Sequence, residues 1–370
     1  MEGIKKNIFR LDQNAIFSNK FDLFVTSGFS ILVSIGLIFF FMLTGQVEGS
    51  SNNSILPKLL LLQVLLNWPH FMLSYRMLYL KKSNFRSFPM ATVGVPLALL
   101  AICIGATTPL FGGAGIMSAN LGISYTLWIF ASLYLAWHYT GQAWGVTIVF
   151  SHLTKLHFTN IECLILRNGL RALVLWHVIW GAQTLPKLWI ITWLQTPFAM
   201  NLASCFAILA FFLSCSVFIR KTVIGGPIDI RVPGPLVAIY LWYLLLWVSP
   251  EAFIVVQMAH ALQYLIFPAR VELNQNLKQS NSRAKMKPLV KTFLVYCVSV
   301  IGGLIVFYLP EVYVISPTGT PTLPALLAIA INIHHYYTDG AIWKSNNSGV
   351  RADLFHHFSP TAAKGTVGQS

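Results

Sequence analysis

Residues 323–343 read LPALLAIAINIHHYYTDGAIW, an apolar run that ends in two adjacent histidines and a carboxylate. About twenty residues of this composition are enough for a helix to cross the hydrocarbon core of a bilayer. A buried Asp in such a helix costs about 2.5–3.5 kcal/mol on insertion scales, so Asp339 needs a compensating partner. The stretch therefore predicts a transmembrane helix that carries a functional group.

The composition of the whole chain agrees with this interpretation. Of its 370 residues 56% are hydrophobic and only 10% charged, and the mean hydropathy is +0.66. Soluble domains carry about 25% charged residues, so a large soluble domain is excluded. The first apolar run begins near Phe24 and is too long for a signal-peptide core, which indicates a retained span. We expect an all-α, polytopic helix bundle in a lipid bilayer.

Window hydropathy predicts about ten transmembrane helices. They form a membrane domain over 22–345, between a cytoplasmic N-terminal segment (1–21) and a C-terminal tail (346–370). The seventh and eighth segments are separated only by Ser249, Pro250 and Glu251, so they could be two short spans or one broken hairpin. The predicted segments are 22–45, 56–80, 89–111, 122–151, 170–193, 199–219, 233–249, 252–269, 289–310 and 323–343.

Basic residues alternate between the connections. All of the 25 Lys and Arg except Lys58 and Lys187 lie in or beside the two terminal segments and every second connection. This is the positive-inside pattern, and it predicts that both termini are cytoplasmic in a bacterial inner membrane. The net charge of +14 then faces an anionic leaflet, which argues against a nucleic-acid partner. The polar, basic stretch 274–287 is expected to be a cytoplasmic loop.

Histidines recur at one depth. His70, His260 and His334 each precede a cytoplasmic basic residue by ten or eleven positions, and His177 follows Arg167 by ten. At 1.5 Å per residue, each lies about 15 Å from that side of the membrane. The six histidines within predicted spans come from five helices and are His70, His138, His177, His260, His334 and His335.

Each of four histidines has a polar companion four residues away on its own helix face. These pairs are His70 with Ser74, His138 with Gln142, His260 with Tyr264, and His335 with Asp339. A metal-bound imidazole usually donates its second N–H to such a group. Asp339 is also the only acidic residue deep within a predicted span.

A single intramembrane histidine is more often a hydrogen-bonded packing residue, and His177, between Trp176 and Trp180, fits that description best. Six imidazoles at one depth are harder to explain by packing. Imidazoles with one carboxylate suit iron, copper or zinc, so we predict a transition-metal centre, most readily of iron. The candidate ligands are His70, His138, His260, His334 and His335.

Four further residues are assigned supporting or catalytic roles. Asp339 is expected to be a ligand or to accept a hydrogen bond from one, and Tyr264 and Gln142 are expected to hold ligands in place. Arg76 could bind the head group of a substrate, or it could be an interface residue whose side chain extends to the polar head groups.

The motifs of soluble hydrolases and nucleotide-binding enzymes are absent, as are the histidine boxes of membrane desaturases. Isolated histidines on separate spans (His70, His138, His260 and His334 or His335) resemble in layout the Brp/Blh-type carotene dioxygenases. The resemblance implies a polytopic enzyme whose histidines hold a non-haem iron. The runs 68–71 (WPHF) and 334–340 (HHYYTDG) are also similar to signatures of a bacterial membrane protein family.

The sequence thus predicts a membrane-bound, metal-dependent oxidoreductase acting on a lipid or isoprenoid substrate. Three alternatives remain open at this point. The histidines could hold haem in a redox protein, the His and Asp layer could relay protons in a transporter, or the protein could be a non-catalytic component of a larger assembly.

Overall fold

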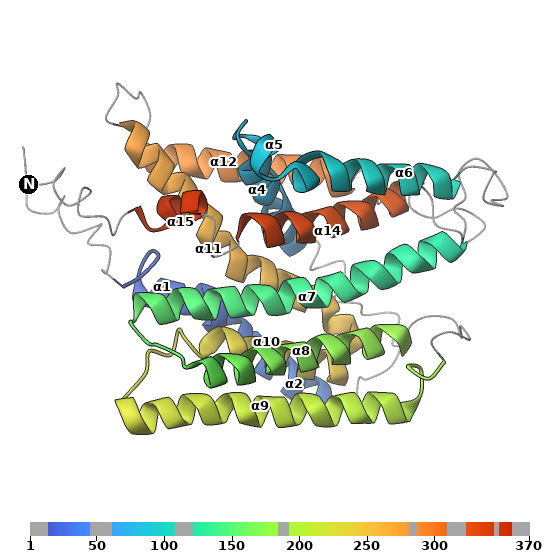
Figure 1. Ribbon diagram of the computed structural model, residues 1–370, viewed down its shortest axis with the longest axis vertical. Helices are drawn as coiled ribbons and strands as arrows, with labels where there is room; N and C mark the ends of the chain where they lie inside the picture. The colour runs from blue at the N-terminus through green and yellow to red at the C-terminus, as the bar shows by residue number, and fades with distance from the viewer. Residues whose placement is uncertain are drawn as a thin grey trace, which may run out of the picture.

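A computed structural model describes residues 14–44, 61–107, 121–183, 192–280, 287–308, 323–343 and 348–356. All regular secondary structure in these ranges is helical, which confirms the all-α part of the predicted fold class. Most helices run roughly parallel to one another in a flattened bundle, and α11 crosses the bundle obliquely (Figure 1).

Each predicted apolar segment overlaps one helical segment. Several helices contain a π-helical or 3-10 turn, labelled η, which continues directly into the α-helix. In chain order the elements are α1 (Asn19–Leu23), η1 (Phe24–Gly28), α2 (Phe29–Thr44), η2 (Gln63–Asn67), α4 (Trp68–Tyr79), α5 (Asn84–Ser87), η3 (Met90–Gly94), α6 (Val95–Thr107), α7 (Leu121–Leu153), α8 (Asn160–Gln183), α9 (Pro197–Gly225), α10 (Gly234–Val248), η6 (Pro250–Ala252), α11 (Phe253–Ser280), α12 (Pro288–Gly303), η7 (Leu304–Tyr308), α14 (Leu323–Ile342) and α15 (Ser348–Leu354).

Six helical segments in the described ranges are long and apolar enough to cross a membrane: 19–44, 90–107, 160–183, 197–225, 250–278 and 288–307. The apolar helix α10 is shorter. Large apolar side chains point outward on several of these helices, for example Leu43 (84% exposed), Phe212 (64%) and Val298 (67%). An outer surface of this kind is suited to lipid and not to water, so the fold is that of a membrane protein.

One end of the bundle gathers the charged residues. The end of α7, the start of α8, the end of α9 and α15 all lie at this end (left in Figure 1). Lys221 contacts Glu162 at 2.8 Å, and Lys81 contacts Asp353 at 2.9 Å. Connections predicted to be basic therefore meet at a common end of the molecule.

The predicted loop at 274–287 is wrong in its first half, because α11 continues to Ser280. Asn274 is buried, and its side-chain amide donates hydrogen bonds to the carbonyl oxygens of Asp353 (2.8 Å) and Leu354 (3.1 Å). The short helix α15 packs on this part of α11 and gives its polar residues buried partners. These contacts explain why a polar sequence remains helical here. Residues 346–347 and 357–370 of the predicted C-terminal tail lie outside the described residues.

Candidate metal centre

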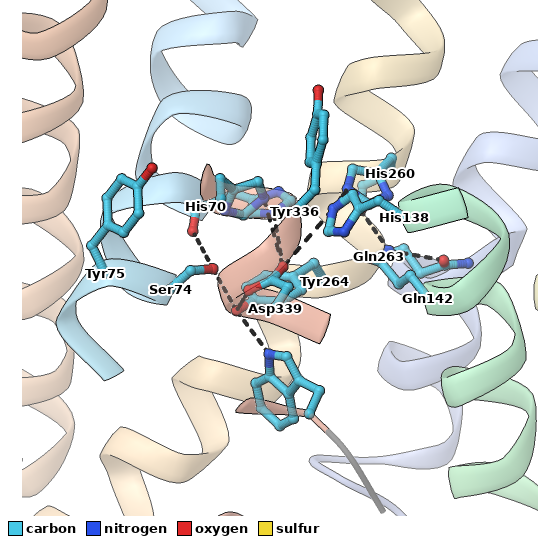
Figure 2. A network of polar contacts seen from close by, with 12 residues as sticks. His70, Ser74, Tyr75, His138, Gln142, His260, Gln263, Tyr264, Tyr336 and Asp339 are labelled. Atoms are coloured by element: carbon cyan, nitrogen blue, oxygen red, sulfur yellow. Dashed lines mark hydrogen bonds and ion pairs between the residues drawn. The ribbon is translucent and has the colours of Figure 1, made fainter. Parts of the chain in front are cut away.

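Four helices bring one imidazole each to a common point inside the bundle. His70 comes from α4, His138 from α7, His260 from α11 and His335 from α14 (Figure 2 labels the first three). All four are at most 8% exposed. The rings pack directly on one another, with centroids 4.5 Å apart for His70 and His335, 4.7 Å for His138 and His260, and 5.1 Å for His138 and His335.

Three of these imidazoles point their Nε2 atoms at the same carboxylate oxygen. The distances to Oδ2 of Asp339 are 3.7 Å from His70, 3.9 Å from His138 and 3.6 Å from His335. They exceed the usual range of about 2.7–3.2 Å for N–H···O hydrogen bonds. Two ligands of a tetrahedral ion with bonds of about 2.1 Å lie about 3.4 Å apart. The buried group of His70, His138, His335 and Asp339 could therefore hold a metal ion.

The other carboxylate oxygen is held by a network of hydrogen bonds. The hydroxyl of Tyr264 donates to Oδ1 of Asp339 at 3.1 Å and accepts from Nε1 of Trp343 at 2.9 Å. The same hydroxyl lies 2.7 Å from Oγ of Ser74 (Figure 2). Because Oδ1 is fixed in this way, Oδ2 is directed at the imidazoles. A hydrogen-bonded second oxygen is the usual support of a metal-ligating carboxylate.

Most of the buried polar atoms facing this point lack hydrogen bonds. Within the described ranges, no partner is found for Oδ2 of Asp339 or for either ring nitrogen of His70 and His335. An unsatisfied buried polar atom costs free energy, and a buried unpaired carboxylate costs more. A cation among these atoms would satisfy Oδ2 and one nitrogen of each ring together. The electrostatics of the cluster thus favour a positive ion.

His260 extends the cluster. Its Nε2 lies 3.0 Å from Nε2 of His138, which is a hydrogen-bond distance. His260 is not among the four residues whose ligand atoms all lie within 4.8 Å of one another, so this predicted ligand lies beside the candidate site. The amide of Gln142 donates to the His260 carbonyl and to Oε1 of Gln263, each at 3.0 Å. Gln142 therefore fixes α7 against α11 and does not bond to the ring of His138, its companion in the sequence.

The local sequence explains how two of these helices present their ligands. His335 and Asp339 of α14 and Trp343, which directly follows it, recur every four residues and so lie on one helix face. In α4, Pro69 has no N–H to donate to the Leu65 carbonyl, and the preceding turn η2 is π-helical. The Leu65 carbonyl accepts a hydrogen bond from the hydroxyl of Tyr296 instead. This turn sets the direction in which His70, the next residue, points.

Three histidine or arginine candidates lie apart from the cluster. Nε2 of His334 donates to the carbonyl oxygen of Ala91 at 2.7 Å, and the His334 ring stacks on Tyr75. His177 is buried between α8 and α10, 5.7 Å from the ring of Tyr243. The guanidinium of Arg76 forms two 3.1 Å hydrogen bonds with Glu272, so its role with a substrate head group stays a prediction.

Two aromatic residues at the site were not singled out by the sequence. Trp343 bonds to Tyr264, and Tyr336 stacks on His138 with ring centroids 4.8 Å apart. The spacing of four residues between Asp339 and Trp343 could have indicated that Trp343 lies at the site. Nothing in the sequence distinguished Tyr336, because aromatic residues are abundant throughout the chain.

The fold and this cluster define the class: a helical membrane protein with a buried group of three histidines and one aspartate that could bind a metal. Comparison of the chain with protein-family models, curated proteins and solved structures finds no match.

Proposed function

We propose that the protein is an integral membrane metalloenzyme, an oxidoreductase whose ion is held by His70, His138, His335 and Asp339. One observation carries the proposal. Three buried Nε2 atoms converge within 3.9 Å on a carboxylate oxygen that has no hydrogen-bond partner in the described structure. If these residues served only to stabilise the fold, we would expect a direct hydrogen bond or ion pair to that oxygen.

Iron is the proposed metal. Imidazole and carboxylate donors suit iron, and three imidazoles with one carboxylate leave two positions of an octahedral ion open. The ion would supply redox chemistry, with dioxygen as the oxidant. The imidazole rings pack directly on one another in three pairs: His70 with His335, His138 with His260, and His138 with His335. Their centroids lie 4.5–5.1 Å apart, so there is no space for a haem macrocycle between the rings of these pairs, which favours a single ion.

The protein's own residues would exclude water and fix the ligands. Phe71 lies against His335 at 4.0 Å between ring centroids, and Tyr139 against His260 at 4.2 Å. These aromatic walls keep the ligand nitrogens out of water. A site enclosed in this way within a membrane bundle suits an apolar substrate such as a lipid or isoprenoid, drawn from the surrounding bilayer.

The proposed topology has ten spans in a bacterial inner membrane, with both termini in the cytoplasm. It is supported by the gathering of Lys81, Lys221, Glu162 and Asp353 at one end of the bundle. His70 lies eleven residues before Lys81, about 16 Å along a helix. The metal would then lie in the cytoplasmic half of the membrane.

Metal analysis and an optical spectrum of the purified protein test the proposal. We expect about one iron per chain, as for a mononuclear site, and no Soret band. His70→Ala and His335→Ala should each remove the metal. The proposal would be contradicted if the isolated protein contained no transition metal or if its spectrum showed a Soret band. It would also be contradicted if neither substitution changed the metal content. Proton-coupled uptake that Asp339→Asn abolishes would contradict it as well, because that result indicates a transporter.

A further inference from the structure

A narrow groove lies beside the candidate metal centre. Its volume is about 300 Å³, and it is bounded by α7 on one side and α14 on the other, with α11 at its floor. His138 and Asp339 of the cluster line it directly. The groove therefore passes alongside the residues that would hold the metal.

The groove is long for its volume. Its α7 wall runs from Tyr134 to Val149, a distance of about 22 Å along a helix. Ligand pockets for compact, drug-sized molecules span about 300–1,000 Å³, so 300 Å³ spread over this length describes a thin channel. It has room for one extended chain and not for a fused ring system.

Glycines leave the outer side of the groove open. A Cβ atom added at Gly141 or Gly145 on α7 would meet no other atom within 4 Å, and both residues are exposed. Gly340 lies on the opposite wall and is exposed as well. The groove thus faces outward from the bundle, where acyl chains would surround the protein in a membrane. At the charged end of the bundle it is bounded by Leu354 of α15, a buried side chain.

The lining is apolar away from the cluster. Trp137, Phe267 and Trp343 supply large aromatic surfaces. The one charged residue in the lining is Asp339, whose Oδ1 is bonded to Tyr264 and whose Oδ2 faces the imidazoles. No Lys or Arg lines the groove, so an anionic head group would find no cationic side chain there. Its occupant must therefore be hydrocarbon over the length that it inserts.

We infer that this groove binds one extended hydrocarbon chain, an acyl or linear isoprenoid chain, which enters sideways from the bilayer and passes beside His138 and Asp339. Its role as substrate rests on the proposed function. A chain that runs along the groove past His138 would present an internal carbon, and not a chain end, to the metal centre. Position-selective oxidation of a long chain is the reaction type that this arrangement suits.

Photocrosslinking tests the groove. The probe is a palmitic acid analogue with a diazirine in its chain, added to the full-length protein in lipid nanodiscs, and the labelled peptides are mapped by mass spectrometry. We expect peptides of α7 and α14 that line the groove to be labelled above the lipid-facing helix α2. Gly145→Leu should bring their labelling down to the level of α2. The metal content should not change, because Gly145 lies about 10 Å along α7 from His138.

Gly36→Leu is the matched control, because Gly36 on α2 also has no atom within 4 Å of an added Cβ. It should change neither labelling nor metal content. If Gly145→Leu folds poorly, Gly340→Leu replaces it in the test. Gly340→Leu fills the groove from the α14 wall and should show the same loss of groove labelling. If the metal-loaded protein is labelled in the groove no more than on α2, this inference is overturned and the proposed function is not. The same holds if the filled variants are labelled in the groove as strongly as the unchanged protein. A labelled groove in protein that binds no metal overturns the proposed function instead.

Discussion

The hydroxyl of Tyr264 on α11 donates a 3.1 Å hydrogen bond to Oδ1 of Asp339 on α14, and so leaves Oδ2 as the oxygen that faces three imidazoles. Trp343 donates to the same hydroxyl, which therefore bridges the indole and the carboxylate. The carboxylate is thereby oriented before any ion binds. Preorganised ligands of this kind raise metal affinity without themselves changing the donor set.

Tyr264→Phe should weaken metal binding without removing a ligand. Loss of a supporting hydrogen bond typically lowers metal affinity by about 10–100-fold. We expect that loss in a competition titration with a chelator, with full loading restored at high metal concentration. Tyr243→Phe is the control, because Tyr243 is an equally buried tyrosine on α10, away from the cluster. Equal affinities for Tyr264→Phe and the unchanged protein would show that this hydrogen bond does not support the ligand.

The two adjacent histidines of α14 should differ in their effect on metal binding. Side chains of neighbouring helical residues point about 100° apart. His335 faces Asp339 and the cluster, whereas His334 bonds to Ala91. His335→Gln should lose the metal and His334→Gln should keep it, as measured by metal content per chain. Loss of the metal in both variants, or in His334→Gln alone, would contradict the assignment.

Much of this arrangement could be predicted from the sequence because it depends on spacing within single helices. The apolar run 323–343, the depth of the histidines, and the pairing of His335 with Asp339 all follow from helical geometry. Which of His334 and His335 faces the cluster depends on the rotation of α14 against α4 and α7. That rotation is set by packing between helices and leaves no local signal.

Contacts between helices account for the other differences. Tyr264 was paired with His260 by its spacing on α11, yet its hydroxyl serves Asp339 on another helix. Gln142 likewise bonds across to α11. The helical extension of α11 to Ser280 depends on α15, a helix about 70 residues later in the chain. Such partners come from the tertiary fold and cannot be read from local periodicity.

Metal removal should lower the thermal stability of the protein. An ion that binds only the folded state at 100 times its dissociation constant stabilises that state by about 2.7 kcal/mol. We expect a chelator to lower the melting temperature in detergent and added metal to restore it. Asp339→Asn removes the charge that attracts the ion, so its melting temperature should not respond to either treatment. A chelator response as large in Asp339→Asn as in the unchanged protein would argue against this site.

The proposed topology predicts which surface positions are accessible from outside the cell. In a variant without the five native cysteines, single cysteines would replace His157, Ile224 or Trp193, all exposed residues. His157 and Ile224 lie at the charged end of the bundle, and Trp193 lies between α8 and α9 at the other end. A membrane-impermeant thiol reagent should label only Trp193→Cys in intact cells. It should label the other two after permeabilisation, and the reverse pattern would invert the topology.

The contacts of Asp353 predict a pH dependence for α15, which bounds the groove at its charged end. Asp353 is held by Lys81 (2.9 Å), Lys278 (3.0 Å) and Gln275 (2.8 Å). Burial raises the pKa of Asp353, but the hydrogen bonds from these three side chains lower it more, so the net pKa is below the usual value. With a depressed pKa in the folded state, the unfolded state binds more protons as the pH falls.

The contribution of Asp353 to stability is therefore complete above the ordinary Asp pKa of about 3.9, and it is lost as the pH falls through the lower folded value. Hydrogen exchange of α15, corrected for its intrinsic pH dependence, should be constant from about pH 7 to about pH 5. Asp353→Asn should raise the exchange rate over that whole range, because the neutral amide loses both ion pairs. Arg351→Gln, at an exposed position of the same helix, should leave it unchanged. If α15 in Asp353→Asn stayed as protected as in the unchanged protein, the ion pairs would not be what holds this helix over the groove.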